Sequence, residues 1–159
     1  MPTNAITTCL RELQKLLGVE KIKITYDYDG RNFPQKPNEW LYNEVVLEQG
    51  NPTPFTLVNE EAGLIIARWN LQEMPSCCGI AIMSEFFVNP RSRKTGVGKE
   101  ISKLIRLIAK KMNYRILLGT DVITNTYHQQ SLKRDKFKSL LKFRNRNTGN
   151  RINISASVL

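Results

Sequence analysis

The segment that most constrains the fold is a glycine-containing loop between an apolar strand pattern and the strongest helix pattern of the chain. Residues 78–88 form a long apolar run that stops at Asn89 and Pro90. Over residues 98–112 the apolar positions fall on one stripe of a helix, with lysines and arginines off it, and residues 115–122 return to a strand pattern. A strand, a helix and a second strand in this order predict a crossover between parallel strands.

The other patterns predict helices and hairpins around this crossover. In chain order they are an amphipathic helix ending at Gly18, a strand over 21–28, a helix over 38–49, a hairpin of 55–58 with 64–71, a polar helix over 124–136, and a terminal hairpin of 139–146 with 151–158. No repeat or linker divides the chain. We therefore expect a single α/β (α+β) domain over residues 1–159, with a mixed, mostly antiparallel sheet flanked by helices.

Composition excludes several classes of protein. A chain of 159 residues can bury a core without disulfides or metals, and its apolar runs are far shorter than the ~20 residues of a membrane span. Cys9, Cys77, Cys78 and the single His128 match neither a disulfide framework nor a zinc spacing. The Cys77–Cys78 pair is expected to begin a buried strand rather than to carry an acyl group, since no histidine lies beside it. We expect a cytoplasmic protein without a metal site or a membrane partner.

Charge is divided unevenly between the two halves of the chain. Residues 1–90 carry 7 basic and 11 acidic side chains, whereas residues 91–159 carry 17 basic and 3 acidic ones. A basic half of this size implies an anionic partner, which could be a nucleotide-like cofactor, a nucleic acid or an acidic protein.

The loop over residues 90–99 has the chemistry of an anion site. Gly96 and Gly98 allow the backbone to approach a ligand, and the first turn of the following helix offers free N–H groups and the positive end of its dipole. The stretch resembles a Walker A loop superficially, but that motif needs glycine at Arg93 and serine or threonine at Glu100, so an NTP-hydrolysing P-loop is excluded. The remaining alternative is a surface turn whose charges are solvated.

The pattern Val88-x-Pro90-x-x-Arg93-x-x-Gly96-x-Gly98 closely resembles the acetyl-CoA motif of the GNAT family of N-acetyltransferases. The element order over residues 55–158 is also similar to that fold, with a splayed central strand pair, while residues 1–54 match loosely and would form the acceptor side. The resemblance implies acetyl-CoA (coenzyme A) as the cofactor. By the same resemblance, Phe87, Val88 and Asn125 would contact the pantetheine arm, and the pyrophosphate would be held by Arg93, Lys94, Thr95, Gly96, Val97, Gly98 and Lys99.

Acyl transfer to an amine needs a base for the amine proton and often an acid for the leaving thiolate. Glu85 lies where some members of the family supply the base, although strand alternation fits an outward-facing carboxylate equally well. Asp121 is the second carboxylate within reach. The resemblance places the acidic tyrosine near Leu132, where there is none. Tyr127 and His128 are the substitutes at hand, but a packing tyrosine and a surface histidine are the simpler interpretation.

Three functions follow. The first is an N-acyltransferase that transfers acetyl from acetyl-CoA to a primary amine of a small molecule or a Lys-containing protein, with the acidic first half suiting a cationic acceptor. The second is a catalytically inactive GNAT-like binding or structural protein, for example one of viral origin. The third is a nucleic-acid-associated protein that uses the eight basic residues of 133–151 together with Phe137 and Phe143, although the apolar positions there also suit the core face of a hairpin. A homodimer is left open.

Overall fold

The computed structural model describes residues 5–34, 47–122 and 137–159. Within these ranges the elements are α1 (Ala5–Leu17), β1 (Ile22–Tyr26), β2 (Arg31–Asn32), β3 (Thr53–Asn59), β4 (Leu64–Met74), β5 (Cys77–Val88), the short 3-10 helix η2 (Pro90–Ser92), α2 (Val97–Lys111), β6 (Ile116–Val122), β7 (Lys138–Arg144) and β8 (Arg151–Val158). The strands form one sheet in the order β2-β1-β3-β4-β5-β6-β8-β7.

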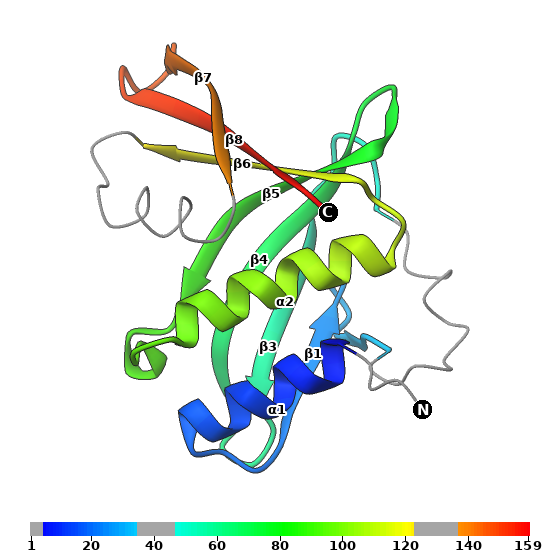
Figure 1. Ribbon diagram of the computed structural model, residues 1–159, viewed down its shortest axis with the longest axis vertical. Helices are drawn as coiled ribbons and strands as arrows, with labels where there is room; N and C mark the ends of the chain where they lie inside the picture. The colour runs from blue at the N-terminus through cyan, green and yellow to red at the C-terminus, as the bar shows by residue number, and fades with distance from the viewer. Residues whose placement is uncertain (1–4, 35–46, 123–136) are drawn as a thin grey trace.

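The sheet is antiparallel except for the pair β5–β6, which α2 connects. The predicted crossover and the mixed, mostly antiparallel sheet are therefore confirmed. The parallel pairing covers only Ile80–Met83 of β5 and Ile116–Gly119 of β6. Beyond it, β5 continues beside β4 and β6 continues beside β8, so the two strands separate toward their carboxyl ends (Figure 1).

Both helices cover the same face of the sheet (Figure 1). The apolar stripe of α2 is buried, as the sequence pattern predicted, and so is one side of α1. Beneath them Trp69 and Phe55 are fully buried and stack at 5.9 Å between ring centroids with an interplanar angle of 7°. Apolar burial of this kind is the main stabilising term of the fold. Among the described residues no helix has the length and apolar character needed to cross a membrane.

Several elements differ from the prediction. The two-residue strand β2 was missed, because Arg31 and Asn32 are exposed and carry no apolar pattern. Most of the predicted helix 38–49 and all of the predicted helix 124–136 lie outside the described residues. The described end of the first of these is not helical, since Gln49 forms a β-bridge with Glu73. Cys77 is half-buried and Cys78 exposed, so the expectation of a buried strand start at this pair was wrong.

The terminal hairpin forms as predicted, but its apolar residues are not a core face. Leu140, Leu141 and Phe143 of β7 are 62%, 57% and 43% exposed. The reason is position, because β7 lies at the edge of the sheet and pairs only with β8. The buried side chains of β8 are instead small and polar, namely Asn153, Ser155 and Ser157.

Candidate functional site

The carboxyl half of β5 contains a β-bulge at Glu85. Arg68 pairs with Phe87 and Asn70 pairs with Ser84, so Glu85 and Phe86 together face the single residue between them on β4. Glu85 has a φ of 52°, which is uncommon for a residue other than glycine and is typical of a position held by its surroundings. The bulge packs Phe86 against the core and leaves Glu85 exposed.

The Glu85 carboxylate is held on the face of the sheet opposite to α1 and α2. Its Oε2 accepts a hydrogen bond of 3.0 Å from Nδ2 of Asn70. Asn70 lies between the buried residues Trp69 and Leu71, and side chains alternate along a strand, so Asn70 and Glu85 face away from the helices. The bulge and this amide together fix a carboxylate two residues beyond Met83, the last residue of β5 that pairs with β6. The place where the two backbones diverge is the opening between β5 and β6.

The end of β5 presents one backbone position to that opening. The N–H of Asn89 donates to the carbonyl of Ile66 on β4 at 2.8 Å, so Val88, its neighbour, directs its backbone groups away from β4. The Val88 carbonyl accepts a hydrogen bond of 2.9 Å from Nε of Arg93, which leaves the N–H as the group facing the opening. Phe87 directs its backbone at β4, while its exposed ring lies 5.7 Å below the Arg93 guanidinium.

The loop after β5 is shaped by local hydrogen bonds. Asn89 caps η2, because its Oδ1 accepts from the N–H of Arg91 at 3.1 Å and its Nδ2 donates to the carbonyl of Ile65 at 2.9 Å. Gly96 is the N-cap of α2 and has a φ of 87°, a conformation that favours glycine. A Cβ added there would lie 3.8 Å from the Leu16 side chain, so the last turn of α1 lies against the loop.

Four backbone N–H groups at this helix start make no hydrogen bond within the described part of the chain, those of Thr95, Gly96, Gly98 and Lys99. The other two N–H groups of this stretch are paired within the loop: that of Lys94 donates to the Ser92 carbonyl at 3.0 Å, and that of Val97 donates to the Lys94 carbonyl at 3.1 Å. A Cβ added at Gly98 would meet nothing within 4 Å, so the protein itself does not require glycine there. Free donors beside an open glycine are what a bound anion needs.

Basic side chains are frequent in this loop and in the first two turns of α2. None of the nearby cations forms an ion pair with a described residue: Arg91, Arg93, Lys94, Lys99 and Lys103. The carboxylate of Glu100, in the first turn of α2, lies 3.4 Å from Sγ of Cys9 on α1. Burial and the Glu100 charge raise the pKa of the Cys9 thiol to about 12, so the thiol stays protonated and can donate to Glu100. The residues present thus fit a diphosphate group.

The predicted site residues fall into three groups. Residues Phe87 to Lys99 come together at the end of β5 and the start of α2, with Glu85 a few residues before them on the same strand. Asp121 lies near the end of β6, and its backbone pairs with Asn153. Asn125 and Tyr127, together with His128 and Leu132, lie outside the described residues. Sequence reasoning missed Asn70, whose contact with Glu85 depends on the register of β4 and β5, a long-range property.

Comparisons with known proteins were made at the level of sequence and of structure. No protein-family model and no curated protein matches the chain. A GNAT-family acetyltransferase from Elizabethkingia anophelis, solved with acetyl-CoA bound, superposes with a TM-score of 0.65 at 15% identity, over 88% of this chain and 99% of that one.

Two further solved structures match over part of their length. A GCN5-related N-acetyltransferase from Brucella melitensis gives a TM-score of 0.57 at 14% identity, and a GNAT-family protein from Chromobacterium violaceum gives 0.58 at 12%. Each covers 68% of this chain, which itself spans about half of their length, 51% and 57%. The similarity is one of backbone arrangement, and it shows that this chain has the GNAT fold.

Proposed function

We propose that the chain is an N-acyltransferase that uses acetyl-CoA and transfers the acetyl group to a primary amine. The observation that carries the proposal is the combination of a parallel strand pair, β5 and β6, that separates toward its carboxyl end and a helix start with four N–H groups that no described residue accepts from. The Elizabethkingia protein of the same fold was solved with acetyl-CoA bound, which supports this choice of ligand.

In this proposal the loop binds the coenzyme by its backbone. The N–H groups of Thr95, Gly96, Gly98 and Lys99 hold the pyrophosphate, and Lys94 and Lys99 add charge. The Val88 N–H, which faces the opening, donates to the pantetheine arm. Arg93 holds the end of β5 rather than contacting the ligand, because its Nε donates a hydrogen bond to the Val88 carbonyl. Gly98 lets the pyrophosphate lie close to the backbone, at a place where a side chain would displace it.

Glu85 is proposed as the general base. The bound coenzyme supplies a thioester carbonyl; as the amine forms its bond to that carbon and the carbon–sulfur bond breaks, Glu85 takes the amine proton, directly or through one water. Asn70 positions the carboxylate through its 3.0 Å hydrogen bond. Asp121 on β6 is the second candidate for this role, and Tyr127 is the candidate acid for the thiolate. The acceptor is proposed to be cationic, in keeping with the acidic first half of the chain.

The test combines binding with turnover. Isothermal titration with acetyl-CoA should show saturable binding, and release of free thiol should depend on an added amine from a panel of polyamines, aminoglycosides and lysine peptides. Glu85→Gln should keep the affinity and lower the turnover about a hundredfold, since general base catalysis contributes factors of that order. Glu60→Gln, which neutralises an exposed carboxylate on the β3–β4 hairpin, is the matched control.

The outcomes separate the candidate functions. Binding without amine-dependent thiol release for any acceptor would favour the inactive GNAT-like binding protein. Unchanged turnover in Glu85→Gln would remove Glu85 as the base. Absence of any saturable binding to acetyl-CoA would refute the proposal as a whole.

A nucleic-acid role is the second candidate, because β7 exposes apolar and basic side chains together. Leu141 and Phe143 are exposed beside Lys142 and Arg144, and aromatic residues among cations can stack on bases and contact phosphates. A gel shift with single-stranded RNA over a salt series should then show binding that weakens steeply with salt. Replacing Lys142, Arg144 and Arg146 by glutamine should abolish it, and undiminished binding would exclude this surface.

A further inference from the structure

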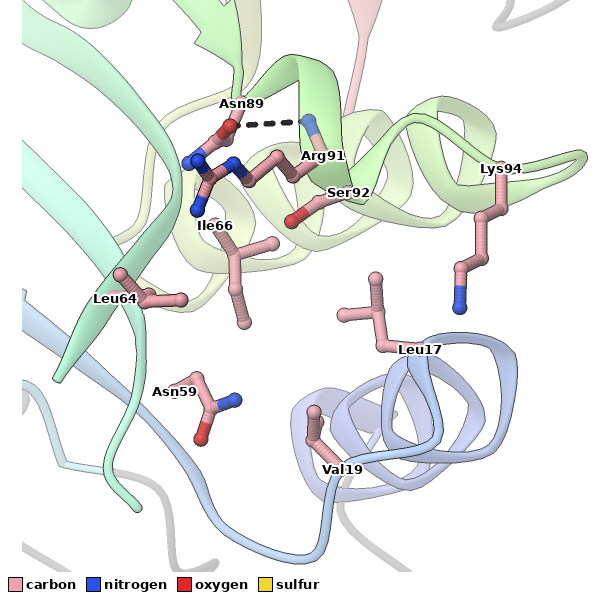
Figure 2. A pocket seen from close by; sticks show the side chains of 9 residues that line it. All are labelled: Leu17, Val19, Asn59, Leu64, Ile66, Asn89, Arg91, Ser92 and Lys94. Carbon is pink, nitrogen blue, oxygen red and sulfur yellow. Dashed lines mark hydrogen bonds between the residues drawn. The ribbon is translucent and has the colours of Figure 1, made fainter. Parts of the chain in front are cut away.

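The hairpin of β7 and β8 is a basic surface that the proposed acyl transfer leaves unused. It is distinct from the phosphate loop, where Arg91 and Lys94 border an open pocket beside the end of α1 (Figure 2). The strands β6 and β8 separate β7 from β5, and β7 is the edge strand of the sheet (Figure 1). Residues 137–159 contain no acidic side chain and five exposed basic ones, none in an ion pair with a described residue: Lys138, Lys142, Arg144, Arg146 and Arg151.

The side chains of β7 divide into a basic face and an apolar face. The register between β7 and β8 is regular from Leu141 to Arg144. Because side chains alternate along a strand, Lys142 and Arg144 lie on one face of the sheet, and Leu141 and Phe143 lie on the other. All four side chains are exposed. A ligand that lies along this edge would therefore meet cations on one side and apolar groups on the other.

The free backbone groups of β7 belong to the same two cationic residues. The N–H of Asn145 donates to the carbonyl of Asn150 at 2.6 Å, which closes the hairpin. Hydrogen-bonded and non-hydrogen-bonded positions alternate in an antiparallel pair, so Arg144 and Lys142 direct their N–H and C=O groups away from β8. No described strand pairs with that side of β7. The edge can therefore accept a further strand at these two residues.

Charge determines which strand fits this edge. Arg144 lies directly opposite Arg151 of β8, and like charges in this arrangement destabilise a sheet. The guanidinium of Arg144 donates to the Gly149 carbonyl at 3.1 Å, but that partner is neutral and leaves the positive charge uncompensated. An acidic residue of an added strand would lie beside these cations and offset their repulsion. A second copy of β7 would bring further cations to the same place, so pairing between two copies of the chain is disfavoured.

We propose that the free edge of β7 binds an extended segment of another protein in which acidic and apolar residues alternate. The acidic residues lie beside Lys142 and Arg144, and the apolar residue between them lies beside Phe143. The backbone of the segment exchanges hydrogen bonds with the outward N–H and C=O groups of β7, so the segment adds a ninth strand to the eight-stranded sheet. A nucleic acid would contact the same cations but would make no use of the backbone edge.

Fluorescence anisotropy with the full chain and three short labelled peptides tests this proposal. The first peptide alternates glutamate and valine, the second has the same composition in block order, and the third is the first with N-methyl groups on its glutamates. The alternating peptide should bind at least about tenfold more tightly than the other two. Only this peptide places its charges on one face and also donates its N–H groups to β7.

Two substitutions at one position separate the charge from the backbone. Lys142→Gln removes one cation and should weaken binding of the alternating peptide about two- to fivefold, as expected for an exposed ion pair. Lys142→Pro also removes the N–H that faces the free edge, a place where edge strands tolerate proline, and should weaken binding roughly tenfold further. Lys110→Gln, at the far end of α2, is the control and should leave binding unchanged. A thermal melt verifies that each variant is folded, and the N-methylated peptide measures the backbone contribution independently of Lys142→Pro.

Four results would overturn the proposal. The first is equal affinity for the alternating and the block peptide, which charge attraction alone would give. The second is an N-methylated peptide that binds as tightly as its parent. The third is self-association of the chain in sedimentation experiments that Lys142→Pro abolishes, because a second copy would then occupy the edge. The fourth is single-stranded RNA that binds in a manner dependent on Lys142 while none of the peptides binds, which would assign the surface to nucleic acid.

Discussion

Replacing Gly98 by alanine should have opposite effects on stability and on ligand binding. Gly98 lies in the first turn of α2, and an added Cβ would meet nothing within 4 Å. Alanine is favoured over glycine in a helix by up to about 1 kcal/mol, and near the helix start we expect roughly 0.5 kcal/mol. For a chain of this length that raises the melting temperature by about 1–2 °C.

The same methyl group would stand where the proposed pyrophosphate approaches the backbone. Displacing the phosphate would weaken its hydrogen bonds to the N–H groups of Gly98 and Lys99, and bonds to charged groups contribute about 1.5–3 kcal/mol. The affinity for acetyl-CoA should therefore fall roughly ten- to a hundredfold. Thermal unfolding without ligand and isothermal titration with acetyl-CoA measure the two effects separately.

Gly96→Ala is the matched comparison within the same loop. Gly96 has a φ of 87°, and the nearest atom to an added Cβ is in ordinary contact at 3.8 Å, so the effect comes from the backbone conformation alone. It should destabilise the protein by about 1–2 kcal/mol. If Gly98→Ala kept the wild-type affinity for acetyl-CoA, or destabilised the protein as Gly96→Ala should, the view of Gly98 as a glycine required by the ligand would be refuted.

Two further predictions concern stability. Burial raises the pKa of Cys9 to about 12 from 9.0 and also raises the pKa of Tyr114, whose hydroxyl donates to Glu73 at 3.1 Å. Between pH 9 and 12 the unfolded chain therefore binds fewer protons than the folded one, so the free energy of unfolding should fall as pH rises. Urea midpoints from pH 8 to 11 should show this decline, with a smaller slope in Cys9→Ala and Tyr114→Phe; identical slopes would contradict it. Trp69→Ala should cost about 3–5 kcal/mol in urea unfolding, because it empties the centre of the core, and a loss under 1 kcal/mol would contradict that packing.

The sequence predicted well those elements whose signals are local. The stripe of α2 and the strand patterns on both sides of it determine a parallel crossover, and the structure has β5, α2 and β6 in that arrangement. The glycines of the loop likewise predicted a tight turn before the helix, because Gly96 has a positive φ that glycine adopts far more readily than other residues. Periodicity and backbone preference act within a few residues, so one sequence suffices to detect them.

What the sequence could not predict depends on register and on neighbours distant in the chain. The bulge at Glu85 and its bond to Asn70 follow from how β4 and β5 pair, which no local pattern encodes. The apolar residues of β7 suggested a core face, yet strand order places β7 at the sheet edge, where Leu140 and Leu141 are exposed. Arg93 was expected at the phosphate, and only the structure shows its bond to the Val88 carbonyl.

The central claim is that the N–H groups at the start of α2 bind the pyrophosphate of coenzyme A. Titrating the ¹⁵N-labelled protein with acetyl-CoA and following its amide resonances tests this claim directly. The account predicts that Thr95, Gly96, Gly98 and Lys99 shift most and reach saturation together. Saturable shifts confined to other segments, such as the β7–β8 hairpin, or no saturable shift at these four amides, would contradict it.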